Sequence, residues 1–136
     1  MNRQKNTKLR HAIETNNLER VKYLIEHGAN KNDALRFACK CLHLDIVKYL
    51  IENGADFQVF VDKFLCISSK YGHLEFVKYL VENGADVHAR YDKALRIASE
   101  YGYLDIVKYL VEHGANVHAC HESALYCACN EGHLDI

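Results

Sequence analysis

The sequence predicts an all-α protein, a solenoid of stacked helix-turn-helix units, and three observations lead to this fold class. Near-identical phrases recur every 30 residues around a glycine: IENGAD at Gly54, VENGAD at Gly84 and VEHGAN at Gly114. A second glycine slot repeats with the same spacing, at Gly72, Gly102 and Gly132. The 136 residues include no proline, and 49% of them are hydrophobic. A repeat period of 20 to 50 residues indicates a stacked array.

Each unit is expected to contain two helices. In the fourth copy, an apolar first helix should end near Tyr101, and a second should run from about Leu104 to His113. The second helix has apolar residues on one face, and Gly114 follows it, where a left-handed cap favours glycine. The segments between units, such as GADVHARYD, are too short for another helix. We expect them to be extended, hairpin-like connections.

The repeats divide a single expected domain, residues 1–136, into six parts. These are a basic N-terminal tail at 1–6, an N-terminal capping repeat at 7–32, full repeats at 33–62, 63–92 and 93–122, and a truncated last repeat at 123–136. Arg20 takes a slot that later copies fill with Ile or Phe, which suits the solvated end of a stack. The last repeat lacks its second helix and a polar cap. Whether Ile136 is a natural terminus stays open.

The turn slot between helices is not always glycine. Asn16 fills it in the first copy and Leu42 in the second. Asparagine tolerates a positive φ, whereas leucine does not. We therefore expect strain or a remodelled turn at Leu42, and a higher melting temperature after Leu42→Gly.

The repeat phrase resembles the ankyrin repeat, a β-turn followed by two helices. The hexapeptide KALRIA at residues 93–98 stands where that family has Thr-Pro-Leu-His-x-Ala, and the spelling is similar in particular to the ankyrin arrays of giant DNA viruses. The unit here has 30 residues rather than 33, which implies a blunt connection between repeats. The Thr-Pro pair is missing throughout. Asp33 could still cap its helix, whereas Lys63 and Lys93 cannot.

Composition and charge exclude several other classes. The formal net charge of −1 argues against a nucleic-acid binder, and no apolar run is long enough for a secretory signal or a membrane span. Six cysteines without a targeting signal favour a reducing intracellular compartment, the cytoplasm or the host cytoplasm of a virus, with the nucleus left open. We expect a monomer with a protein partner and no cofactor.

One cluster of soft ligands suggests zinc: His118, Cys120, His121, Cys127, Cys129 and His133. Its spacing contains no CxxC knuckle, and repeat alignment gives the cysteines structural slots, with Cys129 equivalent to Ser69 and Ser99. The histidines also recur once per unit, which indicates a structural or surface role rather than one active site. A tyrosine ladder at 23, 49, 79 and 109 is interpreted as inter-helix packing rather than a base-stacking platform. The sequence therefore predicts neither an enzyme nor a metal site.

By the resemblance, the fingers and first helices line a concave face that binds a protein. The slots that vary there hold the candidate contacts: Arg36, Lys40, Phe60, Val61, Cys66, Lys70, Arg90, Tyr91, Arg96, Glu100, His121 and Tyr126. Arg90, Tyr91, Arg96 and Tyr126 are the first choices, because Tyr and Arg are frequent hot-spot residues. The predicted function is a non-enzymatic protein-binding module. The alternatives are a truncated array with little independent function and a metal- or redox-responsive module.

Overall fold

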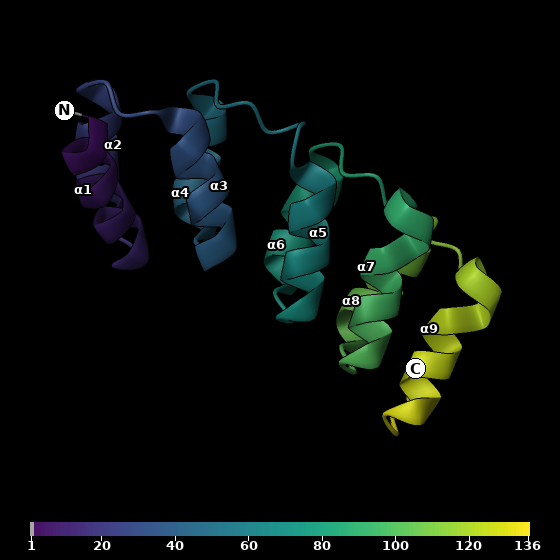
Figure 1. Cartoon of the computed structure of the whole chain (residues 1–136). Coiled ribbons are helices and arrows are strands. Elements are labelled where there is room, and N and C mark those ends of the chain that lie inside the picture. The colour runs from purple at the N-terminus through teal and green to yellow at the C-terminus, as the bar shows by residue number, and fades with distance from the viewer. Residues whose placement is uncertain (1) are drawn as a thin grey trace. The chain divides into compact units, whose positions relative to one another are not determined.

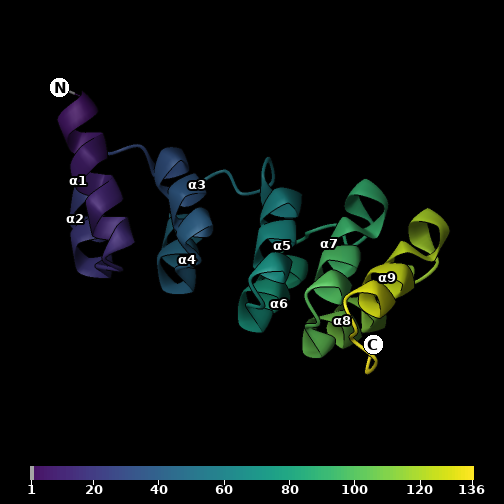
Figure 2. The ribbon, with the colours of Figure 1, turned by 60° about the horizontal axis from the view of Figure 1, so that its bottom comes forward.

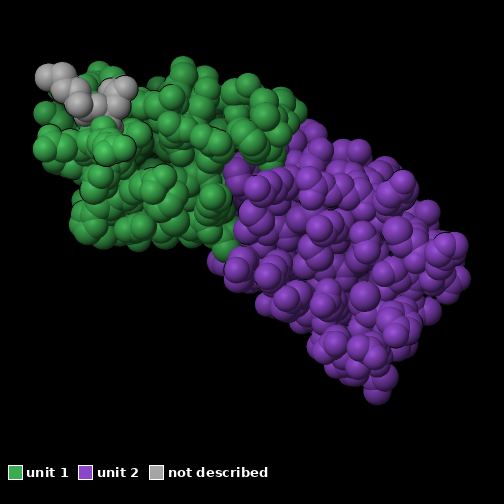
Figure 3. Space-filling model, in the orientation of Figure 1, with its two compact units in different colours: residues 1–60 green, residues 61–136 purple. Residues whose placement is uncertain are grey.

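The structure, a computed structural model, describes residues 2–136 and separates into two compact units. Unit 1 ends at Phe60 and unit 2 begins at Val61, as the two colours of Figure 3 show. All regular secondary structure in the described residues is α-helical, which confirms the predicted fold class. The sequence predicts one domain, but a repeat array makes contacts only between neighbouring repeats and can therefore divide into compact parts.

Unit 1 contains two helix pairs. They are α1 (Asn2–Glu14) with α2 (Leu18–Glu26) and α3 (Lys31–Cys41) with α4 (Leu44–Glu52). The first helices α1 and α3 pack against each other, and the second helices α2 and α4 form a second layer (Figure 1). Helix α1 begins at Asn2, so residues 2–6 are its first turns rather than the tail expected from the sequence.

Unit 2 repeats this two-layer arrangement with five helices in its described residues (Figure 2). They are α5 (Val61–Lys70), α6 (Leu74–Glu82), α7 (Ala89–Glu100), α8 (Leu104–Glu112) and α9 (Ala119–Asn130). The first helices α5, α7 and α9 pack in sequence, and α6 packs on α8. The second helix expected from Leu104 to about His113 is confirmed. Helix α8 begins at Leu104 and ends at Glu112, one residue before the expected end.

The core of each unit comes from the apolar slots of the repeat. Ile46, Val47 and Leu50 of α4 are fully buried, and the equivalent residues of α6 and α8 are buried as well. Alanine in the first helices, such as Ala38 and Ala98, lets neighbouring helices approach closely. A fully buried Leu or Ile contributes roughly 1.5–3 kcal/mol. These repeated slots therefore carry most of the packing energy.

A hydrogen bond that recurs with the repeat ties the first helices α3, α5 and α7 to the loop after the second helix of the same repeat. A side-chain oxygen accepts a backbone N–H 24 residues further on, in the pairs Asn32–Asp56 (2.8 Å), Asp62–Asp86 (2.9 Å) and Asp92–Asn116 (2.7 Å). Sequence reasoning missed this slot, although its 30-residue spacing was visible. The bond holds the loop against the start of the first helix without a Thr-Pro pair.

The start of α3 corrects one expectation about capping. The Asn30 side chain accepts the backbone N–H groups of Asn32 and Asp33, at 2.9 and 3.1 Å. Asp33, the cap expected from the sequence, instead forms an ion pair with Arg36 on the same helix. Asn30 lies just before the helix with an extended backbone, which is the geometry that an N-cap side chain needs.

The connections between repeats are tighter than the extended hairpins expected from the sequence. Residues 90–92 and 120–122 all have φ between 53° and 60°, so the connections into α7 and α9 each contain three left-handed residues. No strand occurs among residues 2–136. These six non-glycine residues store backbone strain, and all of them except the buried Asp92 are exposed.

Candidate functional site

The residues expected to bind a partner lie on the first helices and the turns before them. Some of these residues are exposed, and others are partly or fully buried. Tyr91 and Tyr126 are 76% and 70% exposed, an unusual state for large aromatic side chains. Six others are exposed as well or half-buried near the surface: Arg36, Lys40, Phe60, Lys70, Arg90 and His121. These residues are available to a partner, and their contact role stays a prediction.

Val61 is a correction. It is only 3% exposed and belongs to the first turn of α5, where it packs in the core of unit 2. The sequence placed it at a finger tip because the connection was expected to extend outward. Since α5 begins at this residue, its side chain turns inward and is not available for contact.

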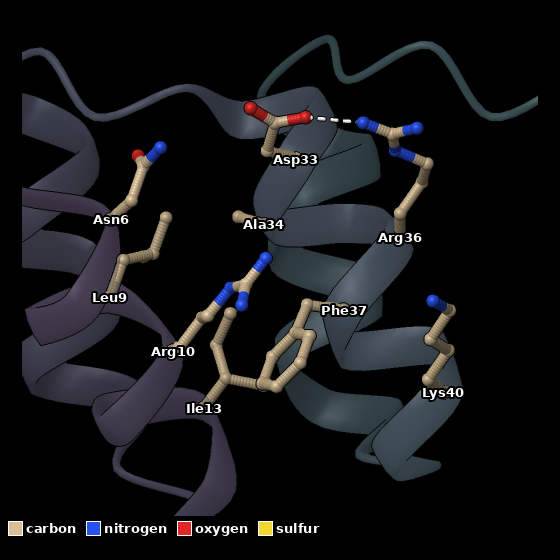
Figure 4. A pocket seen from close by; sticks show the side chains of 9 residues that line it. All are labelled: Asn6, Leu9, Arg10, Ile13, Asp33, Ala34, Arg36, Phe37 and Lys40. Carbon is tan, nitrogen blue, oxygen red and sulfur yellow. Dashed lines mark hydrogen bonds and ion pairs between the residues drawn. The ribbon is translucent and has the colours of Figure 1, made fainter. Parts of the chain in front are cut away.

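In unit 1, helices α1 and α3 enclose a groove of about 270 Å³ (Figure 4). Its lining is Asn6, Leu9, Arg10 and Ile13 from α1, with Asp33, Ala34, Arg36, Phe37 and Lys40 from α3. The residues of α1 that face it are spaced by three or four positions, which places them on one side of a helix. Sequence reasoning found Arg36 and Lys40 but missed the α1 contribution, because the first copy is shortened and Asn6 fell in the expected tail.

Two arginines of this groove lie over aromatic rings. The guanidinium carbon of Arg10 is 5.3 Å from the centroid of Phe37, and that of Arg36 is 5.4 Å from the centroid of Phe60. Arg36 is also bonded to Asp33. Arg10 and Lys40 are exposed and have no carboxylate partner among residues 2–136. The groove therefore has apolar side chains beneath a mixed polar and apolar lining, with positive charge at its rim.

In unit 2, Arg96 has a bracing role within the protein. Its Nε and one terminal nitrogen donate to the carbonyl oxygens of Tyr91 and Arg90, both at 3.3 Å. These two carbonyls belong to the left-handed turn at the start of α7, so the bonds hold that strained turn in place. The side chains of Arg90 and Tyr91 consequently project into solvent from a fixed backbone.

The remaining exposed candidate residues of unit 2 make different contacts from one another. Lys70 lies over the ring of Tyr71, with 5.8 Å between its nitrogen and the ring centroid. Glu100 is exposed, and its carbonyl oxygen lies 2.9 Å from Nε2 of His133. His121 is exposed in the left-handed turn of α9.

Cys66 on α5 is half-buried, and burial raises the pKa of its thiol. The nearby cations Lys93, Arg90 and Arg96 oppose this rise, but they do not cancel it. The thiol is therefore held in its neutral form at neutral pH, and Cys66 offers a partner a small apolar contact rather than a thiolate.

The other cysteines follow their place in the stack. Cys39 is fully buried, and burial strongly raises the pKa of its thiol. Cys129 fills the same slot but is exposed, and Cys127 is half-buried. Within residues 2–136, no group of three or more His, Cys, Asp or Glu side chains is arranged to hold a metal ion.

The tyrosine ladder is partly embedded between helices. Tyr49 and Tyr109 are half-buried, and the nitrogen of Lys22 lies 5.8 Å from the Tyr49 ring centroid. Burial raises the pKa of Tyr109, whose hydroxyl is enclosed without a hydrogen-bond partner among the described residues. Tyr23, in the first copy, is 49% exposed and stacks on His27. These contacts favour packing over base stacking.

Comparison with known proteins gives one family. The family model described as ankyrin repeats (3 copies) matches residues 1–61 and again residues 63–136. No curated protein matches the chain significantly. Within the described part of the chain, no helix has the length and apolar character that crossing a membrane requires.

Proposed function

The chain belongs to the ankyrin-repeat family, and on that premise we propose that it is a non-enzymatic module that binds a partner protein on the concave face of its repeats. Ankyrin repeats are generally protein-interaction modules and are typically not enzymes. The observation that carries the proposal is the exposure of Tyr91 on α7 and Tyr126 on α9. These two helices pack against each other. Exposed aromatic side chains on a rigid helical layer supply contact area at a low entropic cost.

The remaining parts of the proposal rest on the sequence. They are a monomeric chain in a reducing intracellular compartment and, from the 30-residue unit, a closer relation to the ankyrin arrays of giant DNA viruses. The truncated array and the metal- or redox-responsive module gain no support from the family match.

An affinity capture with a matched control tests the proposal. The contact variant is Arg90→Ala, Tyr91→Ala and Tyr126→Ala together, and it leaves Arg96 in place because that side chain braces the turn. The control variant changes three exposed residues of the second-helix layer, Asp105→Ala, Lys108→Ala and Glu112→Ala. Each bait is exposed to the same lysate, and bound proteins are quantified by mass spectrometry.

We expect the wild-type chain and the control to retain a common partner that the contact variant loses. Circular dichroism melting should show that both variants fold, since all six side chains are exposed. Retention of every partner by a folded contact variant would refute the assignment of the binding face.

A further inference from the structure

The charged and apolar residues around the groove between α1 and α3 indicate which kind of peptide segment it can bind. We propose that this α1–α3 groove binds an acidic segment of a partner protein, with the carboxylates of that segment on Arg10 and Lys40 and an apolar side chain on its floor. This inference rests on the proposed function and narrows it to a partner class. It concerns unit 1, whereas the aromatic contacts above belong to unit 2.

Two cations of the groove form no ion pair within residues 2–136. Arg10 and Lys40 stand on its two sides without a carboxylate partner in the described residues, and Asp33, the one acidic side chain in its lining, is already paired with Arg36. A neighbouring hollow shares Asn6 and Arg10 with the groove and adds Arg3. Residues 1–30 contain six Lys and Arg against three Asp and Glu, a net charge of +3, so the other residues carry −4. The lining of the groove itself is also net positive, with Arg10, Arg36 and Lys40 against Asp33.

The floor of the groove is apolar. Leu9, Ile13 and Ala34 are buried beneath it, and the half-buried ring of Phe37 forms part of its α3 wall. Figure 4 shows Arg10 reaching from α1 across to Phe37. Stacking on that ring restrains the guanidinium, so less side-chain entropy is lost when its N–H groups bind a carboxylate. A segment with both carboxylates and an apolar side chain satisfies the rim and the floor together.

A peptide suits these features better than a nucleic acid. The Phe37 ring already lies beneath Arg10, so it is not open to a stacking base. Asp33 places a carboxylate in the lining, and the chain as a whole is slightly acidic, which disfavours a phosphate backbone. Nucleic-acid binding is therefore an outcome of the test rather than part of the inference.

Fluorescence anisotropy with four labelled probes tests the groove. The probes are a short peptide of Glu and Leu, the same peptide with Gln for every Glu, its counterpart with Lys for every Glu, and a single-stranded oligothymidylate. We expect the full chain to bind the Glu/Leu peptide and to bind the Gln/Leu peptide at least about tenfold more weakly. Affinity for the Glu/Leu peptide should fall as salt rises, because exposed charges are screened.

Matched variants locate the binding. Arg10→Gln with Lys40→Gln should weaken binding of the Glu/Leu peptide about tenfold. The control, Lys8→Gln with Lys63→Gln, removes the same charge from exposed positions outside the groove and should keep wild-type affinity. Arg10→Glu with Lys40→Glu should reverse the preference, so that the Lys/Leu peptide is bound. Lys40→Glu alone gives the same direction if the double variants fold poorly.

Three results would overturn the inference. They are no binding of the Glu/Leu peptide, equal losses in the groove and control variants, and tighter binding of the oligothymidylate that depends on Arg10 and Lys40. Partner capture lost in the unit 2 contact variant, together with any of these results, would leave the proposed function standing and remove only this assignment. Capture retained by that variant, together with groove binding, would remove Arg90, Tyr91 and Tyr126 from the binding face and leave the α1–α3 groove as its site.

Discussion

The two units build the turn that follows each first helix from different residues. In unit 1 the turn residues are Asn16 and Leu42, with φ of 51° and 60°. In unit 2 they are glycines, Gly72, Gly102 and Gly132, with φ between 72° and 77°. All five residues are left-handed, so the backbone conformation belongs to the repeat, and the residue type does not determine it. The sequence predicts strain or a remodelled turn at Leu42; its φ of 60° shows that the left-handed turn is kept, and the strain stays a prediction.

The difference shows that two of the unit 2 glycines serve a second purpose. A Cβ at Gly72 would lie 2.5 Å from Cε1 of Tyr103, and a Cβ at Gly102 would lie 2.6 Å from Cε1 of His133. The ring from the following repeat packs directly on each glycine. At Gly132 a Cβ would meet nothing within 4 Å. Glycine is thus needed for φ at all three positions, and for the close approach of a ring at two of them.

The largest expected effect on stability comes from replacing a glycine that both adopts a positive φ and contacts a ring. Gly72→Ala should lower the free energy of unfolding by about 2–4 kcal/mol, because the left-handed backbone disfavours a Cβ and the Tyr103 ring must move. Gly132→Ala, the control, should cost only the backbone term of about 1–2 kcal/mol. Urea unfolding followed by circular dichroism measures both variants. Equal losses would show that the ring contact contributes nothing.

The second prediction concerns a substitution that should relieve backbone strain in unit 1. Leu42→Gly should raise the free energy of unfolding by about 1 kcal/mol and raise the melting temperature, because glycine adopts this φ without a steric penalty. Asn16→Gly should change stability by only a few tenths of a kcal/mol, since asparagine already tolerates the conformation. Thermal melts of both variants decide the matter. A lower melting temperature for Leu42→Gly would mean that its half-buried side chain outweighs the strain.

The third prediction extends the comparison to the small buried slot of the first helices. Cys39 fills it in unit 1, and Ser69 and Ser99 fill it in unit 2. Ser99 Oγ donates to the carbonyl oxygen of Leu95 at 2.9 Å, whereas Ser69 Oγ has no hydrogen-bond partner in the described residues. Ser99→Ala should therefore cost about 1 kcal/mol, and Ser69→Ala should be neutral or stabilising by up to about 1 kcal/mol. Calorimetric melting temperatures that shift alike in the two variants would contradict this difference.

Sequence reasoning recovered the helix pairs, because the apolar and glycine slots recur at a fixed spacing that only a stacked array satisfies. It was less successful where the repeat is irregular. The shortened first copy concealed the part of α1 that lines the groove, and the left-handed turn at the start of α7 was interpreted as extended. Val61 was misplaced because the connection before it was expected to extend outward, whereas α5 already begins at this residue. The path of such a connection depends on φ values that side-chain identity fixes only weakly outside glycine and proline.

The sequence by itself determined the family, the all-α class and the second helix from Leu104, since these follow from local periodicity. Tertiary structure decided how individual side chains are used. Arg36 and Arg96 share one slot of the repeat, yet the first pairs with Asp33 and the second braces a turn. A repeat assigns each residue a position along the chain, but its partners come from neighbouring helices and turns, and these differ from copy to copy.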